Sequence, residues 1–256
     1  MSAVSSSLRE TIITLQNIPS ISQFSLGGGT NLALRYNHRI SIDIDFISSE
    51  IVGKETLEQI VKDVQSIYGI DKVKPILINK DLEEQYMFLR IFLTVGKEVV
   101  KIEFLQNMKC LFNSELVDDI RLVHKTDIGL FKMMSAANRY AKKDIYDLDQ
   151  ITDEINIEKL FSKLGEKREK FKLPEHQSLF DLDEEVNPLD YPEQLLKFDE
   201  VNFNISDKPG HTHDRIDLVE GSKSWTKAKI SWKMKIRKLF NHLGKEFPKP
   251  RGRNIR

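Results

Sequence analysis

The sequence predicts an α+β fold, with a mixed sheet and its helices over residues 1–115 and a mainly helical region over residues 116–256. Two observations favour this class. Helix and strand patterns alternate through the first 110 residues without the regular strand–helix–strand series of a parallel sheet. Beyond Cys110, nearly all apolar residues recur at helical spacing.

The first elements are short and are separated by turn residues. Ser5–Ser7 can cap a helix whose apolar positions are Leu8, Ile12 and Leu15, and Pro19 ends it. We then expect a short apolar strand, a glycine turn, a helix and an alternating strand, at residues 24–26, 27–29, 30–36 and 41–47.

A longer helix and three strands complete the first part. Five apolar residues at 3–4 spacing predict a helix over 54–68, which ends at Gly69. Gly96-Lys97 is typical of a two-residue hairpin turn. The predicted strands are residues 73–78, 84–95 and 98–105.

The second part is predicted to be mainly helical after a short strand over 120–124. Thr126 or Asp127 is expected to cap the first helix. The predicted helices cover residues 128–140, 143–151 and 157–164, and Trp225 to Leu243 presents one apolar helical face. The acidic segment 181–200, with eight acids, one lysine and two prolines, is expected to be a solvated loop or linker.

Composition excludes several classes of protein. The chain has 256 residues, 39 basic and 39 acidic, so its formal net charge is zero. A single cysteine, Cys110, rules out an intrachain disulfide and a cysteine-based zinc site. The first ten residues lack an apolar stretch, and the longest apolar run, 86–95, is too short for a bilayer. We therefore expect a soluble cytoplasmic protein without membrane contact.

The most informative segment joins a Gly28-Gly29-Thr30 turn to Asp43 and Asp45. Glycines at a helix start let backbone N–H groups approach an anion. The two aspartates lie two apart on a predicted strand, so their side chains share a face, with Cα atoms about 6.6 Å apart. Carboxylates so placed can bind Mg²⁺ or Mn²⁺ for phosphoryl or nucleotidyl transfer.

Glu103 is the candidate third metal ligand. In its strand it points opposite to Val100, Ile102 and Phe104, onto the face that a neighbouring strand would share with the aspartates. The alternative is an ordinary turn followed by a solvated strand face. Two aspartates flanked by Ile and Phe disfavour a strand and repel each other unless a cation compensates.

The order of these elements and the Gly-Gly-Thr…Asp-x-Asp pattern resemble the DNA polymerase β-type nucleotidyltransferase superfamily. The longer string from Gly28 to Phe46, including His38-Arg39, is similar to the AbiEii/AbiGii toxins of abortive-infection toxin–antitoxin systems. The matches span residues 25–150. Arg39 can contact a phosphate, whereas His38 has either a chemical or a structural role.

A second match lies downstream, in Asp127 to Arg139 and in Lys143 to Leu148. The resemblance implies active-site roles for Lys132 and Asp144, and less directly for Arg139 and Asp147. Lys132 and Arg139 are seven apart and share a helix face that can meet a triphosphate or an RNA backbone. An interhelical ion-pair network is the alternative.

The resemblance implies a metal-dependent enzyme that adds NMP from an NTP to an RNA acceptor, the 3′ end of tRNA, and so blocks translation. A cognate antitoxin encoded alongside is the implied partner, with or without direct binding. The alternatives are NMP transfer to a small molecule or protein, and a non-catalytic nucleotide- or RNA-binding module.

The zero net charge hides a strong segregation of charge. Residues 221–256 carry twelve basic residues and one acid, whereas residues 1–220 carry 27 basic and 38 acidic residues. The first 220 residues thus have a net charge of −11 and the last 36 a net charge of +11. We expect the basic C-terminal region to hold RNA, with salt-dependent affinity.

Overall fold

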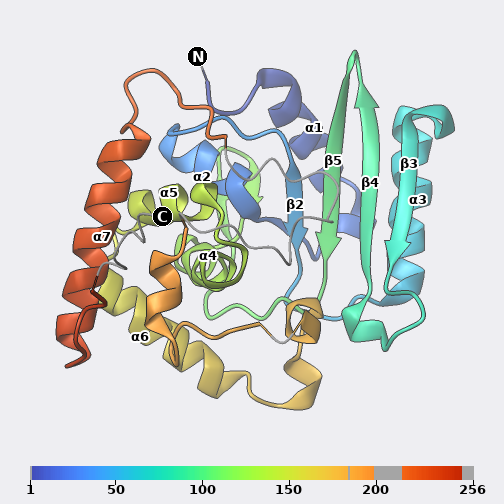
Figure 1. Cartoon of the computed structure of the whole chain (residues 1–256). Helices are drawn as coiled ribbons and strands as arrows, with labels where there is room; N and C mark the ends of the chain where they lie inside the picture. Colours follow the sequence, from blue (N-terminus) through green and yellow to red (C-terminus); the bar gives the residue numbers. More distant parts are fainter. Residues whose placement is uncertain (1, 184, 199–214, 250–256) are drawn as a thin grey trace, which may run out of the picture.

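The computed structural model describes residues 2–183, 185–198 and 215–249, and it confirms an α+β fold (Figure 1). Seven strands of the described chain form one mixed sheet in the order β3-β4-β5-β2-β1-β7-β6. The strands are β1 Ser25–Leu26, β2 Ile44–Ile47, β3 Val73–Ile78, β4 Phe88–Val95, β5 Glu98–Leu105, β6 Glu115–Val117 and β7 Ile120–Leu122. The α-helices are α1 Ser6–Gln16, α2 Gly28–Tyr36, α3 Gly53–Tyr68, α4 Lys125–Arg139, α5 Lys142–Ile151, α6 Ile157–Lys170 and α7 Trp225–His242.

Local sequence signals place most elements of the first half correctly. The side chain of Ser5 accepts a hydrogen bond from the Leu8 amide and begins α1, as predicted. Gly96, with a φ of +61°, turns β4 into β5. The predicted strand over 84–95 begins only at Phe88, because residues 84–86 form a 3₁₀ turn.

The strand predicted over 41–47 is shorter than expected. It begins at Ile44, so Asp43 lies just before β2. The amides of Ile40 and Ser41 donate to the carbonyls of Asp217 and Ala3, not to a neighbouring strand of the sheet. Period-2 alternation could not reveal this, since these partners come from both ends of the chain.

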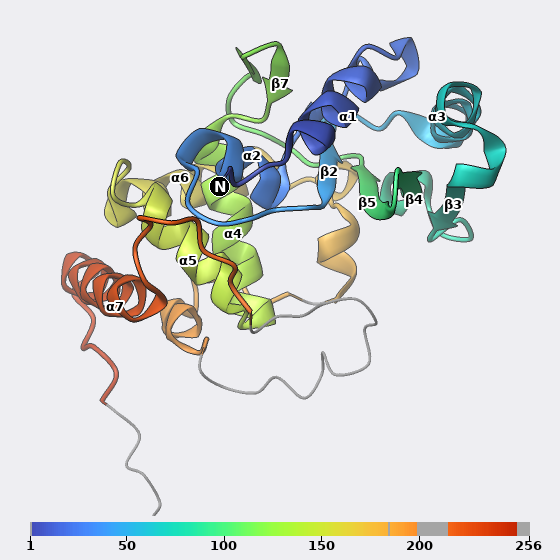
Figure 2. The same cartoon turned by 90° about the horizontal axis from the view of Figure 1, so that it is seen from above.

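Three apolar clusters hold the described chain together. The smallest joins Leu32 of α2, Ile47 of β2 and Ile128 of α4. The two larger ones are the main cores. One lies between the sheet and helices α1 and α3, which share one side of the sheet in Figure 2. The other lies among α4, α5, α6 and α7, with Trp232 fully buried at its centre. Helix α7 therefore contributes to the core, and it lies at the end of the molecule farthest from β3 (Figure 1).

Two predictions for the helical half were wrong in detail. Helix α4 begins at Lys125 and is capped by the His124 ring, whose Nδ1 accepts from the Thr126 amide, not by Thr126 or Asp127. The acidic segment 181–200 is not simply a solvated linker, because Leu195 and Phe198 are buried in the helical core. The described residues do not include 184 and 199–200 of that segment, or 250–256 of the basic C-terminal region.

The division of the chain at residue 115 stays a prediction. The hairpin β6–β7 follows that position and extends the sheet beside β1. Leu218 forms a bridge with Arg39, and Val219 packs in the sheet core. None of the described helices is long and apolar enough to cross a membrane.

Candidate active site

Two of the predicted carboxylates lie next to each other on neighbouring strands. In the parallel pairing of β2 with β5, Asp45 is the register partner of Glu103, so both side chains lie on the same face of the sheet. Burial, reinforced by the negative charge of Glu103, raises the pKa of Asp45 to about 6. Strand parity therefore placed Glu103 correctly, while its role as a metal ligand stays a prediction.

Two cations that the sequence analysis missed hold Glu103. Arg90 donates from Nε and Nη2 to Glu103 Oε1 at 2.8 and 2.5 Å, and Lys101 Nζ donates to Oε2 at 3.0 Å. Lys101 Nζ also lies 3.8 Å from Asp43 Oδ2. Burial alone would raise the pKa of Glu103, but Lys101 and Arg90 lower it. Arg90 is the register partner of Glu103 on β4, and Lys101 lies two residues before Glu103 on β5. The pairing of β4 with β5 is therefore the information that would have identified these two cations.

The donor set fits a metal ion at the two aspartates. Among the described residues, no three acidic, histidine or cysteine side chains form a ready group for a metal. Both oxygens of Glu103 already accept hydrogen bonds from cations. Asp43 and Asp45 retain carboxylate oxygens, and Mg²⁺ is usually held by one or two carboxylates together with substrate phosphates. These two residues therefore suit Mg²⁺ or Mn²⁺ in the presence of an NTP.

The glycine turn makes room for two charged side chains. A Cβ on Gly28, whose φ is +61°, would lie 1.9 Å from Asp45 Oδ2, and one on Gly29 would lie 2.3 Å from an Arg39 guanidinium nitrogen. The Gly27 amide also donates to the Asp45 carbonyl at 2.6 Å. The start of α2 is thus packed against Asp45 and Arg39, an arrangement that only glycine permits.

Thr30 supports the aspartates through the backbone. Its side chain is buried, and its hydroxyl donates to the Asp43 carbonyl and lies 2.8 Å from Ser41 Oγ. The hydroxyl is therefore engaged within the protein. Thr30 fixes the chain immediately before β2, and a contact with NTP phosphates stays a prediction.

The downstream match forms a buried ion network between α4 and α5. Lys132 Nζ lies 2.8 Å from Asp144 Oδ1 and 2.9 Å from Asp147 Oδ2. Arg39 donates to both oxygens of Asp147 at 2.6 and 2.7 Å, and Arg139 lies 3.0 Å from Asp144 Oδ2. Burial alone would raise the pKa of Asp147, but Arg39 and Lys132 hold it well below its usual range.

His38 is part of this network. Its Nε2 lies 2.9 Å from Asp147 Oδ1, and its ring stacks on Tyr146 at a centroid distance of 5.6 Å. The ring is buried, and it belongs with Arg39 to the segment that joins α2 to β2. This geometry favours the structural interpretation of His38 over a direct chemical one.

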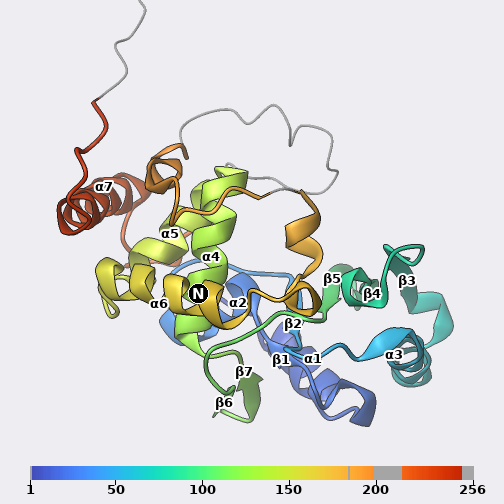
Figure 3. The same ribbon diagram turned by 90° about the horizontal axis from the view of Figure 1, so that it is seen from below.

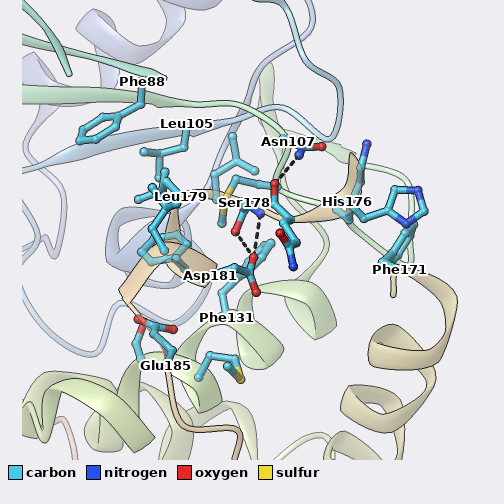
Figure 4. Close-up of a pocket in the computed structure, with 18 of the residues that line it drawn as sticks. Phe88, Leu105, Asn107, Phe131, Phe171, His176, Ser178, Leu179, Asp181 and Glu185 are labelled. Atoms are coloured by element: carbon cyan, nitrogen blue, oxygen red, sulfur yellow. Dashed lines mark hydrogen bonds between the residues drawn. The ribbon is translucent and has the colours of Figure 1, made fainter. Parts of the chain in front are cut away.

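One cavity brings the two halves of the candidate site together. Its volume is about 810 Å³, and its wall includes Asp45 and Glu103 from the sheet and Lys132 and Arg139 from α4. The segment after α6 covers part of it and lies between the helices and the sheet in Figure 3. Figure 4 shows Asn107 hydrogen-bonded to this segment, whose Gln177 carbonyl accepts at 2.7 Å.

Comparisons with known proteins agree with this architecture. A family model described as nucleotidyl transferase AbiEii toxin, type IV toxin–antitoxin system, matches residues 14–218. An uncharacterized protein of Aquifex aeolicus (strain VF5) is 29% identical over 143 residues, which are 55% of this chain and 63% of that protein. The chain thus matches less than two thirds of that relative's length.

Among solved structures, the chain is similar to MenT4, a nucleotidyltransferase toxin of Mycobacterium tuberculosis H37Rv. The TM-score is 0.50 at 16% identity, covering 92% of this chain and 80% of MenT4. At this identity the likeness supports the fold alone. Because the family model covers most of the chain, including both the sheet and the α4–α5 network, the protein belongs to the AbiEii family of nucleotidyltransferase toxins.

Proposed function

We propose that this protein is a toxin that transfers NMP from an NTP to an RNA acceptor, the 3′ end of tRNA, and thereby blocks translation. The observation that carries the proposal is the composition of the cavity wall. Carboxylates from the sheet and cations from α4 face the same 810 Å³ space. Nucleotidyl transfer needs both, since the metal-binding groups and the negatively charged triphosphate must meet there.

The chemistry assigns distinct tasks to the two walls. Asp43 and Asp45 would hold Mg²⁺ or Mn²⁺, which when bound supplies charge neutralisation at the phosphates. Arg139 faces the cavity from the end of α4 and is suited to a phosphate oxygen. Lys132, held by Asp144 and Asp147, adds a fixed positive charge beside it.

In the proposed reaction, an acceptor hydroxyl oxygen attacks the α-phosphorus and releases its proton to water. A new phosphodiester bond forms, the α–β anhydride bond breaks, and pyrophosphate leaves. Glu103, fixed by Arg90 and Lys101, stays ionised and faces the register partner Asp45. Its fixed negative charge would help to orient the hydroxyl, because the Glu103 carboxylate need not rotate when the substrate arrives.

The test is a transfer assay. Purified protein is incubated with total tRNA, Mg²⁺ and each α-labelled NTP in turn, and the label is followed in RNA, protein and small-molecule fractions. We expect label on RNA, and loss of that label with Asp43→Ala, Asp45→Ala or in the presence of a chelator. Asp71→Ala is the matched control, because Asp71 is an exposed acid in the 3₁₀ turn between α3 and β3 and does not line the cavity.

The outcomes separate the candidate functions. Label on a protein or a small molecule would show that the acceptor is not RNA, while the protein would still be a nucleotidyltransferase. Absence of label from every fraction, with all four NTPs, would refute the nucleotidyltransferase proposal and favour a binding module.

We also propose a cytoplasmic location and a cognate antitoxin encoded alongside, in keeping with the type IV description of the family. Expression of the toxin alone should stop growth, and co-expression with the neighbouring gene should restore it. Restoration without co-purification of the two proteins is expected if the antitoxin acts without binding the toxin.

A further inference from the structure

The cavity extends well beyond the carboxylates. Besides the residues around Asp45, its wall includes Lys109, in the segment after β5, and Lys167, near the end of α6. Neither residue belongs to the sequence motifs of the predicted site. Because all these residues line one cavity, a ligand at Lys167 and a ligand at Asp45 would share the same space.

The cations of this wall differ in how they are neutralised. Five of them form ion pairs within the chain: Arg90 with Glu103, Lys132 with Asp144 and Asp147, Arg139 with Asp144, Arg168 with Asp190, and Lys172 with Glu169. Lys109 and Lys167 have no carboxylate within ion-pair distance among the described residues. The Lys109 ammonium donates to the Ser49 carbonyl at 2.8 Å, and Lys167 lies 3.7 Å from the centroid of the Phe131 ring.

The acids nearest to Lys167 are engaged elsewhere. Asp127 accepts hydrogen bonds from the amides of Leu111 and Phe112 at 2.8 and 3.0 Å. Asp181, on the covering segment, accepts from the amide of Ser178 at 2.7 Å, as Figure 4 shows. Burial lowers the pKa of Lys167, while Asp127 and Asp181 act on it only from a distance. The Lys167 ammonium thus lies at the cavity wall on an aromatic ring, with no carboxylate of the described residues in ion-pair contact.

The basic residues of α7 do not share this position. None of the described residues from 221 to 249 lines the cavity. The cations of the cavity wall come from β4, α4, α6 and the segments after β5 and after α6. A C-terminal region that attracts RNA would therefore still need a separate contact to guide the RNA end into the site.

We propose that Lys167 and Lys109 form a phosphate-binding subsite for the backbone of the acceptor RNA, with Phe131 as its apolar wall. This inference rests on the proposed transfer to RNA and identifies where the acceptor lies. The proposed function assigns the triphosphate to other wall residues, at Asp45, the start of α2 and Arg139. A phosphate at Lys167 is therefore a second one, supplied by the acceptor strand.

The test compares Lys167→Gln and Lys109→Gln with Lys163→Gln. Lys163 is the matched control because it lies on α6, pairs with Glu166 at 2.6 Å and stands over the Phe112 ring, yet does not line the cavity. RNA binding is measured by anisotropy with labelled tRNA between about 50 and 200 mM salt. Binding of each of the four NTPs is measured by equilibrium dialysis with Mg²⁺.

We expect Lys167→Gln to weaken tRNA binding about tenfold and to reduce the salt slope by about 1, with NTP binding unchanged. Lys109→Gln should act in the same direction, Lys163→Gln should match the wild type, and Lys167→Arg should restore most of the affinity. If Lys167→Gln does not fold, Lys167→Arg and Lys109→Gln still test the subsite.

Two results would overturn the subsite. One is loss of NTP binding with tRNA binding retained, which would show that Lys167 and Lys109 bind the triphosphate of the NTP and not the RNA backbone. The other is wild-type binding of both ligands by the Lys167 and Lys109 variants. Failure of the wild type to label RNA at all would instead refute the proposed function, so the two failures are distinguishable.

Discussion

At the residue scale, the site depends on how each charge is compensated. Asp45 has a raised pKa because it is buried beside Glu103, whereas Asp147 has a strongly lowered one because two cations surround it. Asp45 is half-buried at the cavity wall, and Asp147 is fully buried against Lys132. Burial raises the pKa of both, and the cations beside Asp147 reverse that effect, which the sequence pattern around each aspartate does not reveal.

Gly28 gives the sharpest prediction at this scale. Gly28→Ala would place a Cβ 1.9 Å from Asp45 Oδ2 at a φ of +61°, so Asp45 must move. We expect a stability loss of about 1–3 kcal/mol and a loss of transfer activity of about 100-fold. The control is Gly221→Ala, where φ is +85° but no atom lies within 4 Å of the new Cβ.

Urea unfolding and the transfer assay are carried out on both glycine variants. Together they distinguish the effect of backbone strain from the effect of displacing Asp45. The Gly221 variant should lose stability but keep its activity. Equal activity in the Gly28 and Gly221 variants would show that the close approach to Asp45 is unimportant.

Asp147 governs a pH-dependent contribution to stability. Its folded-state pKa lies well below the usual value, so the stabilisation is complete above the unfolded pKa of about 3.9. It is lost as the pH falls below that value, through the lower folded pKa. Asp147→Asn should cost about 3–5 kcal/mol at pH 7, because Arg39 and Lys132 lose a buried partner.

Acid and urea titrations check the Asp147 prediction. The variant should also show a shallower loss of stability between about pH 4 and pH 2. Asp190→Asn is the control, since the exposed pair with Arg168 is worth at most about 1 kcal/mol. An Asp147 variant as stable as the Asp190 variant would contradict a buried network.

At the scale of elements, α7 has two roles that the sequence pattern combines in one basic amphipathic stretch. Its apolar face supplies Trp232, Ile236 and Leu239 to the helical core, and the Trp232 indole donates to the Leu195 carbonyl at 2.9 Å. Lys223 and Lys235 anchor the helix region to Asp149 on α5. Removal of residues 221–256 is therefore not a clean test of RNA binding, because it also removes part of the core.

Trp232 tests the structural role of α7. Trp232→Ala should lower the free energy of unfolding by about 3–5 kcal/mol. Ile230→Ala, on the exposed side of the same helix, should change it by less than about 0.5 kcal/mol. Urea unfolding of the two variants makes the comparison, and similar midpoints would show that α7 is peripheral.

At the scale of the whole molecule, the charges are segregated, but the carboxylates of the candidate site and the C-terminal bases are not neighbours. Helix α7 lies on the opposite side of the helical half from the sheet, as Figures 1 and 2 show. The cavity is lined by cations from β4, α4, α6 and the segments after β5 and after α6. In the proposed function, long-range attraction of RNA and its local positioning would thus depend on different parts of the fold.

The C-terminal charges can be tested without loss of the core. Lys227, Lys238 and Lys245 are exposed, and their triple replacement by Gln keeps every buried residue of α7. We expect an unchanged melting temperature and a salt slope of tRNA binding that falls by up to about 2, while a slope from the cavity remains. An unchanged slope would assign all phosphate contacts to the cavity region.

Much of the fold and part of the site could be predicted from the sequence. The glycine turn and Asp45 meet because β1, α2 and β2 are consecutive in the chain. Local geometry therefore suffices to predict that contact. Glu103 was found by strand parity, since alternation assigns the face of every residue in a strand. Arg90, Lys101 and Lys167 were missed because their significance depends on pairing and burial.

The sequence by itself determined the α+β class, the β4–β5 hairpin and the start of α1, because turn residues and apolar periodicity act over a few positions. Only the tertiary structure decided which charges are paired. Arg39 and Asp147 are 108 positions apart, and Lys132 reaches Asp144 only because α5 folds back onto α4. Compensation of a buried charge is a through-space property, so it exists only once distant segments are packed together.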